Sequence, residues 1–547
     1  MGVGRGFETH EVGNQPPPLS PYDAYATDLP LREALRANGG AWAEDRVAKL
    51  GPLVGGEMME LGRLANENPP KLQTFDRYGH RIDQVEFHPA YHRLMQNAVA
   101  HGVVNFGWKH ANTPGAHVAR AALMYLHNQA DQGTSCPLTM SYACIPSLQQ
   151  APTLASSWLP RVLSDAYDAA HAPAWEKTGN TIGMGMTEKQ GGSDVRSNAT
   201  RATALGDGLY ELVGHKWFFS APMCDAFLVL AQAEAGLSCF LLPRFAPDGT
   251  RNGIRLQRLK DKLGDRSNAS SEVEFDHALA WRVGDEGRGI ATILQMVALT
   301  RQDCLIGSAS LMRQALVQAL HHARHRLAFG RRLVEQPLMR NVLADLALES
   351  EAATALALRV ARAIDAGPRD ARAAAFARLA TALGKYWVCK RAPGFVNEAQ
   401  ECLGGAGYVE ESGLPRLYRQ APLNSIWEGS GNIQCLDVLR VLQREPECAR
   451  EYFAELEAVR GADDRLDAEA IRLRACLQAD PANAEAQARA LTERLVLALQ
   501  AATLWRHGEA HVAAAFCRAR LARESGLAYG TLPVDSPIPI LLERALQ

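Results

Sequence analysis

Three kinds of hydrophobic pattern follow one another along the chain. From residue 21 to about 178, apolar residues recur mostly at helical spacing, as in segments 91–96 and 119–129. From about 179 to 285 the pattern changes to short β-like runs separated by turn residues. From about 286, helical spacing returns, beginning with Ile290, Ile293 and Val297. The pattern therefore predicts a helical, a β and a second helical region in that order.

The β-like runs of the middle region are short and are separated by turns such as Gly206-Asp207-Gly208. No long helices connect them, so an antiparallel barrel or sandwich is predicted rather than a parallel Rossmann sheet. The predicted strands are 210–213, 217–220, 226–231, 237–242, 254–259 and 271–275.

Proline and glycine mark the expected ends of the later helices. Pro337 suits the first position of a helix that should stop before Gly367-Pro368. The next helix should run from about 369 to 403 and end at Gly404-Gly405. Long helices of this kind pack as a four-helix bundle. In contrast, segment 134–153 contains too many prolines for one helix, and it either forms a pocket wall or merely connects elements.

A further helical segment, broken near Asp480-Pro481, follows the bundle. The predicted fold is therefore α+β and multidomain. Its parts are a flexible lead-in (1–20), an N-terminal helical domain (21–178), a β domain (179–285), a helical bundle (286–444) and an extra C-terminal helical domain (445–547).

Composition excludes several classes of protein. Lys plus Arg is 58 against 60 Asp plus Glu, so nothing in the whole-chain charge favours nucleic acid or an anionic membrane. The 11 cysteines include no C-x-x-C pair, which indicates reduced thiols in a cytoplasmic protein. Residues 1–20 lack the apolar core of a signal peptide, and no apolar run is long enough to predict a membrane span.

Segment Gly183–Val195, GMGMTEKQGGSDV, is the first with chemical potential. Its small residues expose backbone N–H groups, and Thr187 and Ser193 add hydroxyls, which suits a heterocycle edge and a phosphate. The alternative is a glycine-rich turn before a strand. The chain has no P-loop, no G-x-G-x-x-G, no H-E-x-x-H and no G-x-S-x-G, so a nucleotide ligand needs another scaffold.

Segment Gly214–Pro222, GHKWFFSAP, carries an aromatic run. Aromatic residues in a strand most often pack in a core. The functional interpretation is an aromatic face stacked on a planar cofactor, with Ser220 bonded to the rim of that cofactor.

Segment Asn424–Gln434, NSIWEGSGNIQ, places Glu428 between Trp427 and Gly429. A neighbouring indole removes water from a carboxylate, which favours its use as a base near neutral pH. The glycines let backbone approach a ligand and open a helix N-terminus to an anion. The alternative is a capping loop with an exposed glutamate.

Histidines cluster around Arg324–Gly330, RHRLAFG. His321 and His325 have the i,i+4 spacing of a metal-binding pair, but no third ligand follows, so no metal site is expected. They are interpreted as interface or solvated histidines. Arg326 fits either a phosphate contact or a surface charge.

Taken in order, MTEKQGGSDV, KWFFS, RLAFG, ECLGGAGY and WEGSGN resemble the acyl-CoA dehydrogenase superfamily. The longer stretches GMGMTEKQGGSDV, RLKDKLGDRSNASSEVEF and PLNSIWEGSGNIQCLDVLRVL resemble its AidB branch, which is linked to the adaptive response to DNA alkylation. The resemblance covers residues 20–445 and extends, more weakly, into the C-terminal segment. It implies a helical domain, a central antiparallel β domain, a four-helix bundle and an extra helical domain.

The resemblance also implies FAD as cofactor and α,β-dehydrogenation of an acyl-CoA-like thioester, with Glu428 as the catalytic base. Arg301 and Arg440 would be charges near the substrate. Phe218 stands where many relatives have Trp. The residues implied to contact FAD are Met184, Met186, Thr187, Gly192, Ser193, Trp217, Phe218, Ser220, Ile426, Trp427, Gly429, Ser430, Gly431 and Asn432, with Arg326, Phe329, Gly404 and Gly405 near the FAD of a neighbouring subunit in a homotetramer.

Two functions follow from the resemblance. One is an AidB-like flavoprotein that also binds double-stranded DNA and protects it from alkylation; the other is an ordinary acyl-CoA dehydrogenase of fatty-acid or branched-chain catabolism. Residues 445–547 hold 12 Arg and no Lys against 16 acidic residues, so the segment as a whole is not basic. Arg518, Arg520 and Arg523 form either a local phosphate-binding stripe or a solvated helix face.

Overall fold

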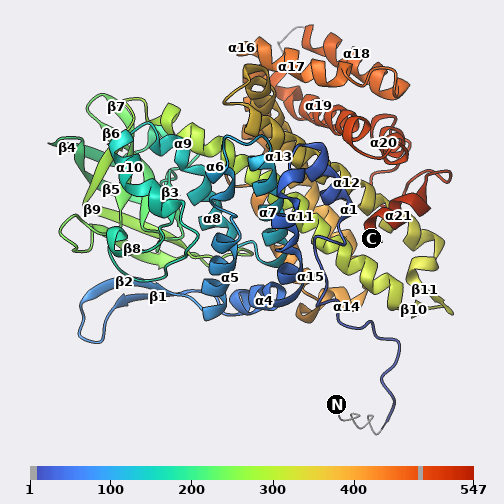
Figure 1. Cartoon of the computed structure of the whole chain (residues 1–547), viewed down its shortest axis with the longest axis horizontal. Helices are drawn as coiled ribbons and strands as arrows, with labels where there is room; N and C mark the ends of the chain where they lie inside the picture. The colour runs from blue at the N-terminus through green and yellow to red at the C-terminus, as the bar shows by residue number, and fades with distance from the viewer. Residues whose placement is uncertain (1–8, 479–483, 547) are drawn as a thin grey trace.

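The computed structural model describes residues 9–478 and 484–546 (Figure 1). A helical region, a sheet and a bundle of long helices follow one another, which confirms the predicted fold class. The predicted break at Asp480-Pro481 lies outside the described residues. Within those residues, no helix combines the length and the apolar character needed to cross a membrane.

The N-terminal region is mostly helical, as predicted, but it also contains a hairpin that the pattern missed. Strand β1 (Lys71–Phe75) pairs with β2 (Arg81–Glu86), and β1 has no buried residue, so no run of core residues marks it in the sequence. Segment 134–153 contains three helices rather than one, α8, α9 and the start of α10. The helices are α1 (Leu29–Ala37), α2 (Glu44–Ala48), α3 (Gly51–Leu53), α4 (Met59–Glu67), α5 (Pro89–Ala100), α6 (Phe106–Lys109), α7 (Ala116–Ala130), α8 (Ser135–Ala143), α9 (Ile145–Leu148) and α10 (Pro152–Val162).

The central sheet has seven strands, and most of its pairs are antiparallel. The exceptions are the parallel pairings of β3 and β4 with β6, two short strands that the pattern did not predict. The two runs predicted at 210–213 and 217–220 form one continuous strand, β5. The strands are β3 (Ile182–Gly185), β4 (Arg201–Gly206), β5 (Leu209–Ser220), β6 (Ala226–Ala233), β7 (Gly236–Pro243), β8 (Ile254–Leu259) and β9 (Ser270–Val283).

The bundle is built on three long helices, which pack pairwise against one another. Helix α12 begins at Pro337 and ends before Gly367, as predicted. Helix α13 ends two residues before the predicted limit, just ahead of Gly404. The bundle elements are α11 (Gly289–His325), α12 (Pro337–Ala366), α13 (Ala371–Glu401), α14 (Gly405–Tyr408), α15 (Leu414–Gln420) and α16 (Gly431–Arg444), with the small hairpin of β10 (Leu327–Ala328) and β11 (Arg331–Arg332) between α11 and α12.

The C-terminal helices pack on the outside of this bundle (Figure 1). Helix α19 lies against α12, α13 and α16, and α21 returns to α12 and α1. Arg544 of α21 pairs with Glu33 of α1 and, at 2.7 Å, with Glu351 of α12. The helices are α17 (Pro446–Glu457), α18 (Asp464–Gln478), α19 (Ala484–His507), α20 (Ala510–Phe516) and α21 (Ile538–Leu546).

Two large hydrophobic cores organise the described residues. One joins the N-terminal helices, the bundle and the C-terminal helices. The other joins the sheet to α8, α9 and the first turns of α11. Trp427 packs against the sheet core, so the loop that carries Glu428 lies where the bundle meets the sheet.

Candidate active site

Glu428 lies in a loop whose carbonyl groups accept hydrogen bonds from side chains of α11, α13 and α16. Its own φ is +57°, a left-handed conformation that costs an L-residue roughly 1–3 kcal/mol. Lys385 of α13 donates from Nζ to the carbonyls of Asn424 (3.0 Å) and Gly429 (2.8 Å). Gln434 of α16 donates to the Glu428 and Gly429 carbonyls at 3.2 and 3.0 Å. These contacts maintain the strained backbone and fix the direction of the carboxylate.

The Glu428 carboxylate is hydrogen-bonded to the hydroxyl of Thr300. Thr300 Oγ1 of α11 lies 2.7 Å from Glu428 Oε2 and 3.0 Å from the carbonyl of Val297. A hydroxyl has one hydrogen and two lone pairs, so Thr300 donates to only one of these oxygens at a time. It donates to Glu428 when the carboxylate is ionised. It accepts from Glu428, with its own hydrogen turned to Val297, when the carboxyl is protonated.

The two arginines expected near the substrate both lie near Asp437. Arg301 donates from Nε to the Glu428 carbonyl (3.0 Å) and from Nη1 to Asp437 (2.9 Å). Arg378 of α13 holds the other oxygen of Asp437 at 2.7 Å. Burial opposes ionisation of Asp437, but the bonded Arg378 and the nearby Arg301 lower its pKa. Arg440 is half exposed, and its guanidinium stands 3.8 Å from Asp437. Arg301 is therefore a contact of the Glu428 backbone in this structure.

The aromatic run of β5 has one exposed and one buried ring. Phe218 is 54% exposed, whereas Phe219, on the opposite face of the strand, is fully buried. Lys260 Nζ sits 3.4 Å from the centre of the Trp217 ring and 4.7 Å from that of Phe218. Ser220 Oγ lies 3.2 Å from Ser270 Oγ. Of the three aromatic residues, only Phe219 fits the interpretation as a core residue. The exposed Phe218 fits the interpretation as a face for a planar cofactor.

The glycine-rich loop docks on this strand. Trp217 N–H donates to the Thr187 carbonyl at 2.9 Å, and Asn198 Nδ2 donates to the Met186 carbonyl at 2.9 Å. A Cβ at Gly192 would stand 2.3 Å from Thr187 Oγ1, so only glycine allows the loop to fold back this closely. Met184 is buried in β3, and Ser193 is exposed at the loop surface.

A buried ion pair connects the loop to the sheet. Glu188 Oε1 accepts from Lys216 Nζ at 2.8 Å, and both side chains are fully buried. Burial opposes the charge on Glu188, but Lys216, Thr200 and Ala199 lower its pKa to about 2. Burial lowers the pKa of Lys216 to about 8 despite the attraction of Glu188. Both groups are charged at neutral pH, and they fix the position of the loop.

The loop after Glu428 leads into α16. Ser430 is the N-cap of α16, yet its side chain makes no capping hydrogen bond. Gly431 is buried, Ile426 is 61% exposed, and Trp427 Nε1 donates to Asn424 Oδ1 at 2.9 Å. Asn432 Oδ1 accepts from Arg489 of α19 at 2.8 Å, which links the C-terminal helices to this loop.

The residues assigned to a neighbouring subunit lie far out on the surface. Phe329, at the tip of the β10–β11 hairpin, is 100% exposed and has a φ of +52°. Arg326 donates from Nη1 to the Asn14 carbonyl at 2.6 Å, which places the lead-in against this hairpin. Gly404 (φ +59°) and Gly405 are exposed at the end of α13.

The histidine pair lies beside the same lead-in. His321 Nε2 is 2.7 Å from the Pro17 carbonyl, and His325 Nδ1 is 2.8 Å from the His321 carbonyl. Both rings are therefore engaged by backbone oxygens.

The three arginines of the expected DNA stripe differ in their surroundings. Arg520 is buried and pairs with Asp345 and with Glu349 (3.0 Å). Arg518 pairs with Glu524 (2.8 Å) and Asp535 (2.9 Å). Arg523 is exposed, and it makes no ion pair with the described residues. The three therefore do not form a uniform solvated stripe.

Sequence reasoning missed two of the groups that shape this site. Thr300 carries no local signal, because the register that turns it toward Glu428 depends on how α11 packs. Lys385 does carry one. It stands in the otherwise apolar run TALGKYWVC, where a buried ammonium needs nearby acceptors.

Comparison with protein-family models divides the chain into three matched regions. Residues 14–169 match the adaptive response protein AidB N-terminal domain. Residues 183–278 match the acyl-CoA dehydrogenase middle domain, and residues 287–443 match the acyl-CoA dehydrogenase C-terminal domain.

Individual relatives agree with these matches. AidB of Escherichia coli K12 is 50% identical over 526 residues, covering 95% of this chain and 96% of its own. Acyl-CoA dehydrogenase family member 11 of Caenorhabditis elegans is 31% identical, covering 81% and 74%. The crystal structure of C. elegans ACDH-11 in complex with C11-CoA superposes with a TM-score of 0.86 at 27% identity, covering 95% of this chain and 94% of that one.

Proposed function

Because the chain belongs to the acyl-CoA dehydrogenase family, in its AidB branch, we propose that Glu428 is the base with which it dehydrogenates an acyl-CoA. Enzymes of this family are FAD-dependent oxidoreductases that act on the CH–CH group of an acyl-CoA. The observation that carries the proposal is the rigid presentation of a half-buried carboxylate in the loop whose Trp427 packs against the core of the sheet.

The residues present fit a flavin. The exposed ring of Phe218 offers a stacking face beside the Ser220 hydroxyl, and the unused N-cap Ser430 leaves the α16 N-terminus open to a phosphate. Thr187, Ser193 and the backbone around Gly192 would bind the polar edge and the phosphates. When bound there, FAD supplies the acceptor for the hydride that leaves the β-carbon.

Glu428 would remove the proton of the α-carbon as the hydride leaves the β-carbon. The substrate thereby loses one proton and one hydride, which leaves a double bond between the two carbons. Thr300 serves both protonation states, because it donates to the carboxylate before the transfer and accepts from the carboxyl afterwards. Arg301, Lys385 and Gln434 hold the loop carbonyls, so the carboxylate need not reorient during the step.

Flavin bleaching by undecanoyl-CoA under anaerobic conditions tests the base. We expect Glu428→Gln to bind FAD normally and to slow bleaching by roughly 10²–10⁴-fold, since the amide cannot accept the proton. Bleaching at the wild-type rate would contradict the assignment of Glu428. Butyryl-CoA and octanoyl-CoA, measured in parallel, would report the chain-length preference. The choice of an 11-carbon probe follows the C11-CoA complex of the C. elegans relative.

A homotetramer is part of the proposal. The fully exposed Phe329 and the exposed Gly404-Gly405 turn are surfaces that a neighbouring subunit would cover, with Arg326 and Phe329 near its FAD. Light scattering on the FAD-loaded protein should give four times the chain mass of 59.5 kDa. A monomeric mass with full flavin content would contradict it.

We also propose that the chain binds double-stranded DNA. The match of residues 14–169 to the AidB N-terminal domain and the 50% identity to E. coli AidB support this second function. A binding titration against salt tests it, because each phosphate contact contributes a slope of about −0.9 in log K against log salt. Binding without salt dependence, or none at low salt, would favour an ordinary acyl-CoA dehydrogenase.

A further inference from the structure

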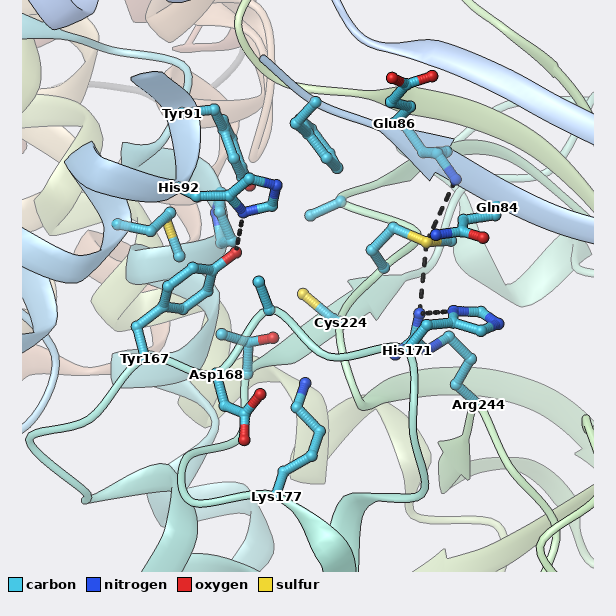
Figure 2. Close-up of a pocket in the computed structure, with 18 residues that line it drawn as sticks. Gln84, Glu86, Tyr91, His92, Tyr167, Asp168, His171, Lys177, Cys224 and Arg244 are labelled. Atoms are coloured by element: carbon cyan, nitrogen blue, oxygen red, sulfur yellow. Dashed lines mark hydrogen bonds between the residues drawn. The ribbon is translucent and has the colours of Figure 1, made fainter. Parts of the chain in front are cut away.

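A cavity of about 160 Å³ lies away from Glu428, between β2, α5, the segment 167–181 and the loop 221–224 (Figure 2). None of the side chains that hold Glu428 or that are assigned to FAD lines it. An apolar cavity of about 150 Å³ holds a benzene ring, so this volume is that of a small organic molecule.

One wall of the cavity is aromatic and apolar. Phe87 and Tyr91 stack with ring centroids 4.0 Å apart, and Pro137 and Cys224 complete the apolar lining. Figure 2 places Tyr91, His92 and Tyr167 on one side and Arg244 with His171 on the other, with Cys224 between them.

Most polar groups at the cavity are already paired. His92 Nδ1 and Tyr167 OH are 3.0 Å apart. Lys177 Nζ donates to the buried Asp225 at 2.7 Å. Asp168 accepts from the backbone N–H groups of Ala170 (2.9 Å) and Thr178 (3.1 Å) in its own loop. Glu86 lies exposed at the cavity and makes no ion pair with the described residues.

Arg244 is buried at the cavity but incompletely paired. Its side chain is only 9% exposed, and Nη1 contacts His171 Nδ1 (3.0 Å) and Met223 Sδ (3.3 Å). Nε is buried without a hydrogen-bond partner, and Nη2 is no closer than 3.9 Å to Asp225, which Lys177 already engages. Nε and Nη2 form the edge of a guanidinium that binds a carboxylate with two parallel hydrogen bonds.

His171 accepts from one nitrogen of Arg244 but carries no negative charge to balance the guanidinium. Burial and the nearby Arg244 lower the pKa of His171 to about 4, so the ring is neutral at physiological pH. Its Nδ1 accepts from Arg244 Nη1, so His171 leaves Arg244 Nε without a hydrogen-bond partner.

We propose that this cavity binds a small monocarboxylate with a flat apolar body, of about the size of benzoate. The carboxylate accepts from the free edge of Arg244, and the body lies against Phe87 and Tyr91. The site is separate from the dehydrogenation site and does not rest on the proposed function.

Equilibrium dialysis of radiolabelled benzoate against the full-length FAD-loaded protein tests this site. We expect saturable binding of one benzoate per chain that undecanoyl-CoA does not displace. Benzamide, which has the same shape without the charge, should not compete. Absence of saturable binding, displacement by undecanoyl-CoA or competition by benzamide would each overturn the proposal.

Two variants locate the binding. Arg244→Gln removes the charge and should weaken benzoate binding at least tenfold. Met223→Trp keeps the charge but fills the cavity, and it should abolish binding even if Arg244→Gln fails to fold. Arg282→Gln, a change at a partly exposed arginine of β9 that does not line the cavity, is the matched control and should bind benzoate as wild type does. Wild-type affinity in Met223→Trp, or in a folded Arg244→Gln, would overturn the proposal.

Discussion

The hydroxyl of Thr300 lies 2.7 Å from the carboxylate of Glu428, although 128 residues separate the two in the chain. The contact joins the N-terminal third of α11 to the loop before α16, and it gives the carboxylate a hydrogen-bond partner in either protonation state.

Thr300→Val should slow flavin reduction by about 10–100-fold, because a hydrogen bond to a charged group contributes roughly 1.5–3 kcal/mol. Thr300→Ser keeps the hydroxyl and should restore most of the rate. Stopped-flow bleaching by undecanoyl-CoA measures both. Equal rates in the valine and serine variants would show that the hydroxyl plays no part.

Arg301→Gln should lower the maximal rate of flavin reduction at least tenfold with little change in KM, because it releases the Glu428 carbonyl and one side of Asp437. Arg440→Gln, a matched change at a half-exposed arginine, should stay within about twofold of wild type. A raised KM in Arg440→Gln would place Arg440 at the substrate instead.

Glu188→Gln should cost about 3–5 kcal/mol, because it leaves the Lys216 ammonium buried without its counter-charge. Adding Lys216→Met should recover most of that loss, since a neutral pair has no buried charge to desolvate. Thermal unfolding of the two variants beside wild type measures the difference. Two variants of equal stability would mean that Lys216 keeps adequate partners, such as the Leu230 carbonyl.

Stability should fall as the pH drops from about 6.5 to 4, in part because of His127. This ring is fully buried, and burial lowers its pKa to about 4, so the unfolded chain takes up a proton that the folded chain refuses. Its contribution is present above pH 6.5 and is lost on the order of 1.4 kcal/mol per pH unit below it. His127→Gln should flatten that slope, whereas replacing the exposed His80 should not.

Arg520→Ala should destabilise the fold, because Asp345 would lose its guanidinium partner in a buried place. Arg523→Ala should leave the melting temperature unchanged, since that side chain is exposed and makes no ion pair within the described residues. A loss of DNA affinity in Arg523→Ala would therefore indicate a lost DNA contact. In Arg520→Ala the same loss would indicate a lost contact only if the melting temperature were unchanged. Unchanged DNA affinity in Arg523→Ala would remove the one arginine of the expected stripe that makes no ion pair within the described residues.

Helix ends marked by a proline or glycine could be predicted from the sequence. Helix α12 begins and ends where Pro337 and Gly367 require, because proline and glycine act through local backbone geometry. The hairpin β1–β2 and the short strands β3 and β4 were missed. β1 and β4 have no buried residue and β3 is buried throughout, so none of the three strands alternates between buried and exposed residues.

The candidate site was predictable only in part for the same reason. Motifs located Glu428 and the aromatic run of β5, but not Thr300, whose role depends on the rotation of a 37-residue helix. Charge counting treated Arg518, Arg520 and Arg523 as equivalent. Arg520 differs from the other two because it pairs with Asp345 and Glu349, about 170 positions away in the chain. No local sequence pattern predicts such a pairing.

The pairing of Arg544 with Glu33 has a consequence for biosynthesis. The partners stand 511 residues apart in the chain. At about 5–20 residues per second, helix α1 emerges from the ribosome roughly half a minute to two minutes before its partner. During that interval the face of α1 that packs against α21 is uncovered, so the N-terminal region completes its packing only after α21 has been made.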